Sequence, residues 1–185
     1  MGGPLIAWES AFSAAEVDRI NAIGDNLARE RAELVLAADA LGKKRVTDVS
    51  WLQRDSSTHW LFARLEQVVR HLNSQYYKYA IFNELREAPQ YTVYDASQGG
   101  HYDWHVDHGS GGPDARKLSL SVQLSDPSAY EGCDLELQFG DGIVTAPRSR
   151  GTVIAFSSYV LHRVTPVTAG TRKSLVTWVS GPEFT

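Results

Sequence analysis

Two segments among the first 75 residues carry apolar residues at helical spacing. The first follows a Ser-Ala-Ala-Glu sequence that starts at Ser13, which is the spacing of a capping box, and it predicts a helix over about residues 14–33. Residues 39–55 are charged and aperiodic, and we expect a solvated loop there. The second helix is predicted by apolar residues at i, i+4, i+7, i+8 and i+11, namely Leu61, Leu65, Val68, Val69 and Leu72.

From Tyr76 onward the pattern changes to short β-branched and aromatic runs separated by clusters of Gly, Pro, Asp and Ser. Strands spaced in this way are typical of a sandwich or a barrel. One predicted strand, residues 118–124, alternates apolar residues with the small or polar residues Ser119, Ser121 and Gln123. Since side chains alternate across a strand, that polar face must look either to water or into a wet cavity.

The expected fold is therefore mainly β with amino-terminal helices (α+β), built on a double-stranded β-helix, or jelly-roll, core. We expect one domain over residues 1–185, with helical support over about 1–75 and the jelly-roll core over about 76–181. A length of 185 residues agrees with a single domain, because domains commonly have roughly 100–200 residues.

Composition narrows the possible partners. The chain has 18 Lys and Arg against 22 Asp and Glu, a net charge of −4, which gives no electrostatic reason to expect nucleic acid or an anionic membrane. Its single cysteine, Cys133, excludes an internal disulfide and a thiolate zinc site. No stretch approaches the ~20 apolar residues of a membrane helix. We expect a soluble, cytoplasmic protein with no nucleic-acid, membrane or disulfide partner.

Three residues could hold a metal ion together. His105 and Asp107 are two residues apart, so on a strand they point to the same face. His162 follows 55 residues after Asp107, next to an apolar run that predicts a strand. Two imidazoles and one carboxylate leave three coordination positions open, which is the arrangement suited to non-haem Fe(II) oxygenases.

A basic residue suited to binding a carboxylate follows the second histidine. Arg172 lies ten residues after His162, and on a strand it shares a face with Ser174 and Trp178. A guanidinium and a hydroxyl can then converge on a carboxylate beside the metal, since the guanidinium fork binds carboxylates bidentately. A surface ion pair is the alternative explanation for Arg172 taken alone.

The region from Gln90 to Ser180 resembles the Fe(II)/2-oxoglutarate-dependent dioxygenases, specifically the prolyl 4-hydroxylase-like branch and its bacterial PKHD-type members. The likeness covers about half of the chain and agrees in the order, spacing and flanking residues of its motifs. These include Tyr102-Asp103-Trp104-His105-Val106-Asp107, the segment from Lys117 to Pro127, Tyr130-Glu131-Gly132, and the segment from His162 to Trp178.

The resemblance implies a role for each matching residue. The iron ligands would be His105, Asp107 and His162. Arg172, with Ser174, would bind the distal carboxylate of 2-oxoglutarate. The remaining matches are to residues near the co-substrate or in the pocket: Tyr94, which matches a tyrosine that approaches the co-substrate; Gln123, which falls where some relatives have a tyrosine; and the pocket residues Tyr102, Ser119 and Trp178.

The resemblance also implies the reaction. An enzyme of this kind uses Fe(II), 2-oxoglutarate and O2 to hydroxylate an aliphatic carbon, here of an amino-acid side chain that is free, peptidyl or protein-borne, and releases succinate and CO2. A stimulatory effect of ascorbate is left open. Asp107 favours hydroxylation over halogenation, because related halogenases leave the carboxylate position vacant for halide.

Two features are left open by the sequence. The segments expected around the mouth of the site are Ala38–Asp55 and His108–Lys117, and the second is equally consistent with a lid and with an ordinary loop. The alternative to an oxygenase is a cupin-like metal-binding jelly roll that acts as a ligand-binding protein or as a non-oxygenase metalloenzyme. Such a protein has no need of Arg172 beside Ser174.

Overall fold

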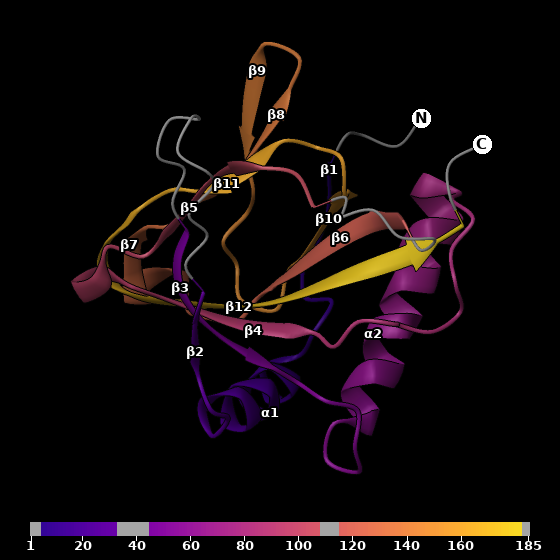
Figure 1. The fold of residues 1–185 in the computed structure, drawn as a ribbon, viewed down its shortest axis with the longest axis horizontal. Helices are drawn as coiled ribbons and strands as arrows, with labels where there is room; N and C mark the ends of the chain where they lie inside the picture. The colour runs from indigo at the N-terminus through magenta and orange to yellow at the C-terminus, as the bar shows by residue number, and fades with distance from the viewer. Residues whose placement is uncertain (1–4, 33–44, 108–114, 183–185) are drawn as a thin grey trace.

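The computed structural model describes residues 5–32, 45–107 and 115–182, which form a curled antiparallel sheet with two helices on its outside (Figure 1). The sheet order is β1-β10-β6-β12-β4-β3-β5-β11-β8-β9, with β2 beside β3 and β7 beside β12. The first layer consists of β1 (Leu5–Trp8), β10 (Val153–Ser157), β6 (Ala115–Gln123), β12 (Val167–Gly181), β4 (Gln90–Asp95), β3 (Arg45–Trp51) and β2 (Glu30–Ala32).

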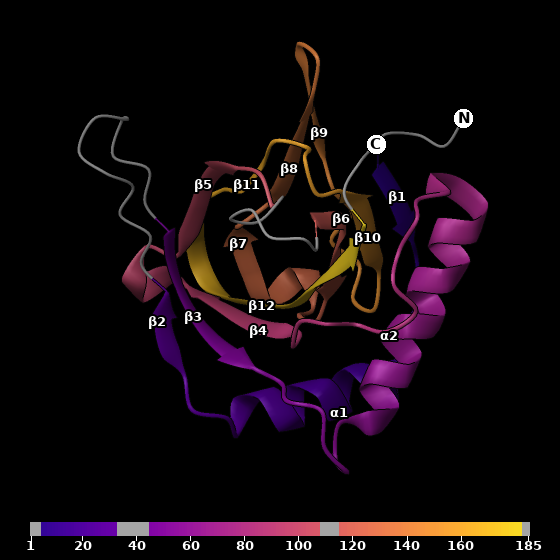
Figure 2. The same ribbon diagram turned by 45° about the vertical axis from the view of Figure 1, so that its right-hand side comes forward.

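The second layer is smaller and faces the first across the interior of the molecule (Figure 2). Strand β3 connects the two layers, because its residues 48–51 pair with β4 and its residues 45–46 pair with β5. This arrangement is the jelly roll expected from the sequence. The second layer consists of β5 (His101–His105), β11 (His162–Val164), β8 (Leu135–Phe139) and β9 (Gly142–Thr145). Strand β7 (Tyr130–Gly132) pairs with the amino-terminal end of β12.

Both long helices lie outside the first layer (Figure 2). Helix α1 (Ala14–Asp25) begins with the expected capping box, in which Glu16 N–H donates to Ser13 Oγ and Ser13 N–H donates to Glu16 Oε2. Helix α2 (His59–Leu72) buries all five of its predicted apolar positions. The shorter helical turns are the π turn Asn73–Tyr77 and the 3-10 turns Ala96–Gln98 and Pro127–Ala129.

Strand β6 shows how the first layer separates two environments. Its apolar residues Leu118, Leu120 and Val122 belong to the core that the sheet forms with α1 and α2. Ser119, Ser121 and Gln123 alternate with them, and Ser119 and Gln123 contact buried polar groups on the inner side of the sheet. The polar face of β6 therefore looks into a wet interior rather than to bulk water.

A second core fills part of the space between the layers. It is formed by apolar residues of both layers and of β7, and it leaves a polar pocket beside it. Its buried members are Tyr94, Tyr130, Cys133, Leu135, Leu137, Ala146, Ile154, Phe156, Val164 and Val167.

The amino-terminal part differs from the prediction in three ways. Helix α1 ends at Asp25 rather than near residue 33, because Asn26 caps it and residues 30–32 pair with β3 as β2. The loop expected over 39–55 is wrong for residues 45–51, which form β3; residues 39–44 lie outside the described residues. The described residues before 76 therefore include three strands, and the expected helical support over about 1–75 also contributes β1, β2 and β3 to the sheet. Within the described segments, no helix is long and apolar enough to cross a membrane.

Candidate metal centre and co-substrate pocket

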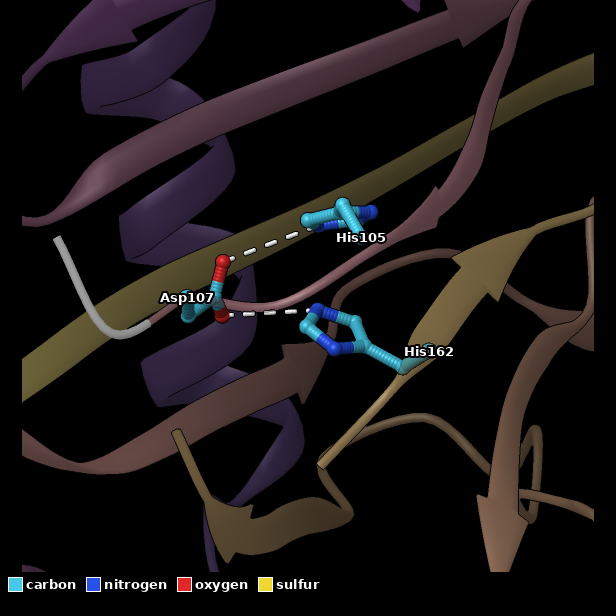
Figure 3. A group of neighbouring side chains, drawn as sticks. All are labelled: His105, Asp107 and His162. Atoms are coloured by element: carbon cyan, nitrogen blue, oxygen red, sulfur yellow. Dashed lines mark ion pairs between the residues drawn. The ribbon is translucent and has the colours of Figure 1, made fainter. Parts of the chain in front are cut away.

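Three side chains converge at the inner side of the second layer. His105 ends β5, Asp107 follows two residues later, and His162 begins β11, the strand paired with β5 (Figure 3). One donor atom from each lies within 4.8 Å of the others. Asp107 Oδ1 is 3.6 Å from His105 Nε2, and Asp107 Oδ2 is 3.4 Å from His162 Nε2.

Backbone contacts set the orientation of both imidazoles. Nδ1 of His105 is 2.7 Å from the carbonyl oxygen of Asp103, and Nδ1 of His162 is 2.9 Å from the carbonyl oxygen of Val160. A carbonyl only accepts, so each Nδ1 donates to it, and each Nε2 is the ring nitrogen that faces Asp107. Metal-binding histidines commonly have this second hydrogen bond, which fixes the tautomer and the ring.

The environment favours the protonation states that a metal requires. Burial, together with the nearby His162, lowers the pKa of His105 to about 4, so its ring is neutral at pH 7. Burial acts to raise the pKa of Asp107, but the contacts with His162 and His105 outweigh it and hold that pKa well below its ordinary value. The neutral imidazole of His105, the imidazole of His162 and the Asp107 carboxylate form a donor set that fits a divalent iron ion with open positions.

Neighbouring side chains support the ligands. Ser119 Oγ donates to Asp107 Oδ2 at 2.8 Å, and the Asp107 N–H donates to the carbonyl of Ser158 at 2.8 Å. The ring of Tyr102 stacks on His105 with centroids 3.5 Å apart. Burial raises the pKa of Tyr102 to about 12, so the phenol is neutral at physiological pH. Ser119 and Tyr102, which the sequence analysis assigned to the pocket, thus contact the candidate ligands Asp107 and His105.

Arg172 lies in the same interior on β12. Its side chain is 2 % exposed, and its Nη2 donates to Gln123 Oε1 at 2.9 Å. Gln123 Nε2 in turn donates to the carbonyl of Pro147 at 2.9 Å, which fixes the amide that receives the guanidinium. Among the residues that the structure describes, no carboxylate pairs with Arg172. A buried guanidinium of this kind fits a ligand that brings its own carboxylate.

The other predicted co-substrate residues lie around Arg172. The centre of its guanidinium is 5.8 Å from the ring centroid of Tyr94, which is buried and whose pKa is raised by that burial. Ser174 Oγ is 2.6 Å from Thr92 Oγ1 on the neighbouring strand. Lys173, between them in sequence, points outward and pairs with Asp25 on α1. The strand register predicted for residues 172–178 is therefore confirmed.

The candidate metal ligands and Arg172 line one cavity of about 480 Å³, which we call the central pocket. Gln123 and Ser119 lie behind its wall, in contact with Arg172 and Asp107. Eight of the predicted site residues line it: Tyr94, Tyr102, His105, Asp107, His162, Arg172, Ser174 and Trp178.

The sequence analysis did not assign a site role to several lining residues, among them Arg45 and Trp51 on β3, Gln90 on β4 and Arg116 on β6. The sequence over residues 45–51 has no apolar alternation that would have marked it as a strand. Arg45 and Trp51 lie in the expected mouth segment Ala38–Asp55, and Arg116 lies in the expected segment His108–Lys117. For the segment His108–Lys117 a lid and an ordinary loop were both left open, and its residues 108–114 lie outside the described part of the chain.

A jelly roll with two imidazoles, one carboxylate and a buried guanidinium around one pocket defines the class of non-haem iron proteins that bind a carboxylate co-substrate. The chain belongs to the 2OG-Fe(II) oxygenase superfamily, whose family model matches residues 89–180. This family takes its name from ferrous iron and 2-oxoglutarate, and the residues of the central pocket fit both.

Curated relatives and solved structures agree with this assignment. The chain is 36 % identical over 99 residues to a PKHD-type hydroxylase of Synechococcus sp. (strain CC9605), a match that covers 53 % of this chain and 45 % of the relative. A PKHD-type hydroxylase of Psychrobacter sp. (strain PRwf-1) is 36 % identical over 97 residues, 49 % of this chain and 37 % of the relative. The chain thus spans less than half the length of these relatives.

The fold is shared with solved prolyl hydroxylases. A Pseudomonas putida prolyl-4-hydroxylase superposes with a TM-score of 0.69 at 18 % identity, over 97 % of this chain and 94 % of that one. A viral collagen prolyl hydroxylase from Paramecium bursaria Chlorella virus-1, solved with 2-oxoglutarate, gives a TM-score of 0.71 at 20 % identity, over 97 % of both chains. These similarities establish the jelly-roll fold.

Proposed function

We propose that this protein is an Fe(II)- and 2-oxoglutarate-dependent hydroxylase that acts on an aliphatic carbon of an amino-acid side chain. The observation that carries the proposal is the convergence of His105, Asp107 and His162 with Arg172 around the central pocket. The amino-acid substrate is supported by the similarity to prolyl and PKHD-type hydroxylases.

The residues of the chain divide the work. Nε2 of His105, Nε2 of His162 and a carboxylate oxygen of Asp107 would hold the iron. Arg172, oriented by Gln123, would hold the distal carboxylate of 2-oxoglutarate, and Ser174 lies beside it. The bound iron and co-substrate supply the oxidising chemistry, which yields succinate, CO2 and a hydroxylated product. Burial of the pocket excludes water from the reacting groups.

The cupin-like alternative is not favoured. A ligand-binding jelly roll or a non-oxygenase metalloenzyme would explain the metal ligands, but it would not explain a guanidinium that is 2 % exposed and faces the same pocket. Asp107 also supports hydroxylation over halogenation, since it occupies the carboxylate position that halogenases leave to halide. The net charge of −4 gives no electrostatic reason to expect a nucleic-acid substrate, so we expect a small molecule, a peptide or a protein as the substrate, and a cytoplasmic protein.

The test is aerobic incubation of the full chain with Fe(II) and 2-oxoglutarate, with succinate as the readout and candidate amino acids and peptides screened for a mass increase of +16. We expect succinate to require both Fe(II) and 2-oxoglutarate, and ascorbate is included as an optional stimulant. Controls omit the metal, the co-substrate or oxygen. Metal binding with no succinate under any of these conditions would favour the ligand-binding alternative.

A further inference from the structure

Arg45 is a second buried cation in the central pocket and is not used by the metal or the co-substrate as assigned above. It begins β3, lines the pocket and is 9 % exposed. Its Nη2 donates to Gln90 Oε1 at 2.7 Å, and its guanidinium centre lies 4.7 Å from the ring centroid of Tyr102. Both partners are neutral groups, so neither balances its charge.

Arg45 differs in this respect from the other two arginines of the pocket. Arg116 donates through Nε to Glu87 Oε1 at 2.8 Å and forms an ion pair with that carboxylate. Arg172 is assigned to the distal carboxylate of the co-substrate. Among the residues that the structure describes, Arg45 has no carboxylate partner, and its Nε has no hydrogen-bond partner at all. A buried guanidinium left in this state is costly unless a ligand completes it.

We propose that Arg45 binds a carboxylate of the primary substrate, which makes the substrate a small carboxylic acid such as a free amino acid. This inference rests on the proposed function. Tyr102 lies between the guanidinium and His105, in ring contact with both, so an acid held at Arg45 stays close to the metal ligands. The fork of Arg45 suits a carboxylate, and Gln90 fixes its orientation.

The size of the pocket agrees with a small substrate. A cavity of about 480 Å³ must hold the co-substrate together with the reacting part of the substrate. Asp107 is the sole carboxylate among the described residues that line it, against the cations Arg45 and Arg172 and against Arg116, which is already paired with Glu87. The excess positive charge favours an anionic substrate over an internal segment of a protein, whose backbone is neutral.

The test compares acids with matched neutral compounds. Wild-type chain with Fe(II) and 2-oxoglutarate is given each free L-amino acid, its carboxamide and its N-acetyl derivative, and succinate and hydroxylated product are measured. We expect turnover of an acid and little of its carboxamide. An active N-acetyl derivative would identify a carboxy-terminal residue as a further source of the same carboxylate and would also support the proposal.

Three variants assign the effect to Arg45. Arg45→Gln should raise the KM for the acid by roughly 10- to 100-fold, which is the loss of a charge-assisted hydrogen bond. Arg45→Lys should lose less, because it keeps the charge but not the fork. In both variants the KM for the acid should rise more than the KM for 2-oxoglutarate. Arg54→Gln is the control, since Arg54 lies 4.3 Å from the Phe62 ring centroid and pairs with Glu66 outside the pocket.

The proposal and the function on which it rests fail differently. Equal turnover of acid and carboxamide by the wild type, or an unchanged KM for the acid in both Arg45 variants, overturns the role of Arg45 while the hydroxylase stands. A rise in the KM for 2-oxoglutarate in Arg45→Gln that exceeds the rise in the KM for the acid also overturns it, because Arg45 would then bind the co-substrate. Absence of succinate contradicts the proposed function, and anaerobic calorimetry with the same amino acids then tests Arg45 by binding alone.

Discussion

His162 on β11 is the cross-strand partner of His105 on β5, although 57 residues separate them in sequence. Their ring centroids are 4.1 Å apart, with both Nε2 atoms near the Asp107 carboxylate. Because side chains alternate across a strand, a shift of one residue in this pairing would turn one imidazole away from the other. The candidate metal centre is therefore a consequence of strand register.

Removal of any one ligand should abolish Fe(II)-dependent turnover. In His105→Ala, Asp107→Ala and His162→Ala the site keeps two protein ligands, and nothing among the described neighbours replaces the third. The fold should remain, because the triad lies at a pocket wall rather than in either apolar core. Succinate release measures the turnover, and far-ultraviolet circular dichroism checks that the fold is retained. Turnover close to wild type in any variant would contradict the triad.

The hydroxyl of Ser119 should strengthen metal binding through Asp107. It donates to Oδ2 of that carboxylate, and a hydrogen bond of this kind orients a ligand and tunes its basicity. Ser119→Ala should weaken Fe(II) affinity by roughly 10-fold, at the lower end of the usual range for such contacts. Ser121→Ala is the matched control, since Ser121 shares the same face of β6 and lines the pocket. An equal loss in both variants would argue against the role of Ser119.

The triad and Arg172 could be predicted from sequence because His105, His162 and Arg172 lie on strands, and Asp107 follows the end of β5 by two residues. His105 and Asp107 are two residues apart, and so are Arg172 and Ser174. The interior of a jelly roll lies on one side of each strand, so two-residue spacing is enough to place such side chains together.

Arg45 could not be predicted in this way. Strand β3 is covered on both faces, and five of its seven residues are buried. The face toward the pocket carries Arg45 and Thr47, so the apolar alternation that marks a half-exposed strand is missing. The end of α1 was hidden for a related reason: Leu27 continues the apolar spacing and packs against the core, although Asn26 has already capped the helix.

Arg172 should control affinity for 2-oxoglutarate. If it binds the distal carboxylate, Arg172→Ala should raise the 2-oxoglutarate requirement by roughly 30- to 1000-fold, or about 2–4 kcal/mol, and Arg172→Lys should be milder. Metal affinity without co-substrate should change little. Lys173→Ala is the control, because Lys173 pairs with Asp25 on the outer side of the sheet. A larger loss in the control would overturn the assignment.

Gln123 should act through the orientation of Arg172. Gln123→Leu removes the acceptor at 2.9 Å from Nη2 and should raise the 2-oxoglutarate requirement by roughly 3- to 10-fold, the value of a single hydrogen bond. Gln123→Glu should be worse, because a carboxylate there neutralises Arg172 and competes with the co-substrate. Titration of 2-oxoglutarate in both variants checks the order. A milder effect in Gln123→Glu than in Gln123→Leu would show that a carboxylate at position 123 does not compete with 2-oxoglutarate for Arg172.

Asp25 should make stability depend on pH at the contact between α1 and β12. It accepts hydrogen bonds from the Tyr91 hydroxyl at 3.0 Å and from Lys173 Nζ at 2.7 Å. Burial acts to raise the pKa of Asp25, but the hydrogen bonds from Lys173 and Tyr91 outweigh it, so the folded-state pKa lies below the ordinary value. The charged carboxylate is thus favoured by folding, and its contribution is present above about pH 4 and is lost as the pH falls through the folded-state pKa.

Asp25→Asn should accordingly destabilise the protein at pH 7 by about 1 kcal/mol, a value kept small because the carboxylate is partly exposed to solvent. The difference from wild type should shrink as the pH falls below about 4, because the wild-type Asp25 carboxylate then becomes protonated and, like the amide, uncharged. Urea unfolding at several pH values measures this. Asp18→Asn is the control, since Asp18 pairs with Arg150 at a side chain that is 71 % exposed, and its removal should cost a few tenths of a kcal/mol, roughly. A difference for Asp25→Asn that stays constant from pH 7 to about pH 3 would show that the amide disrupts packing and that the charge of Asp25 does not stabilise the fold.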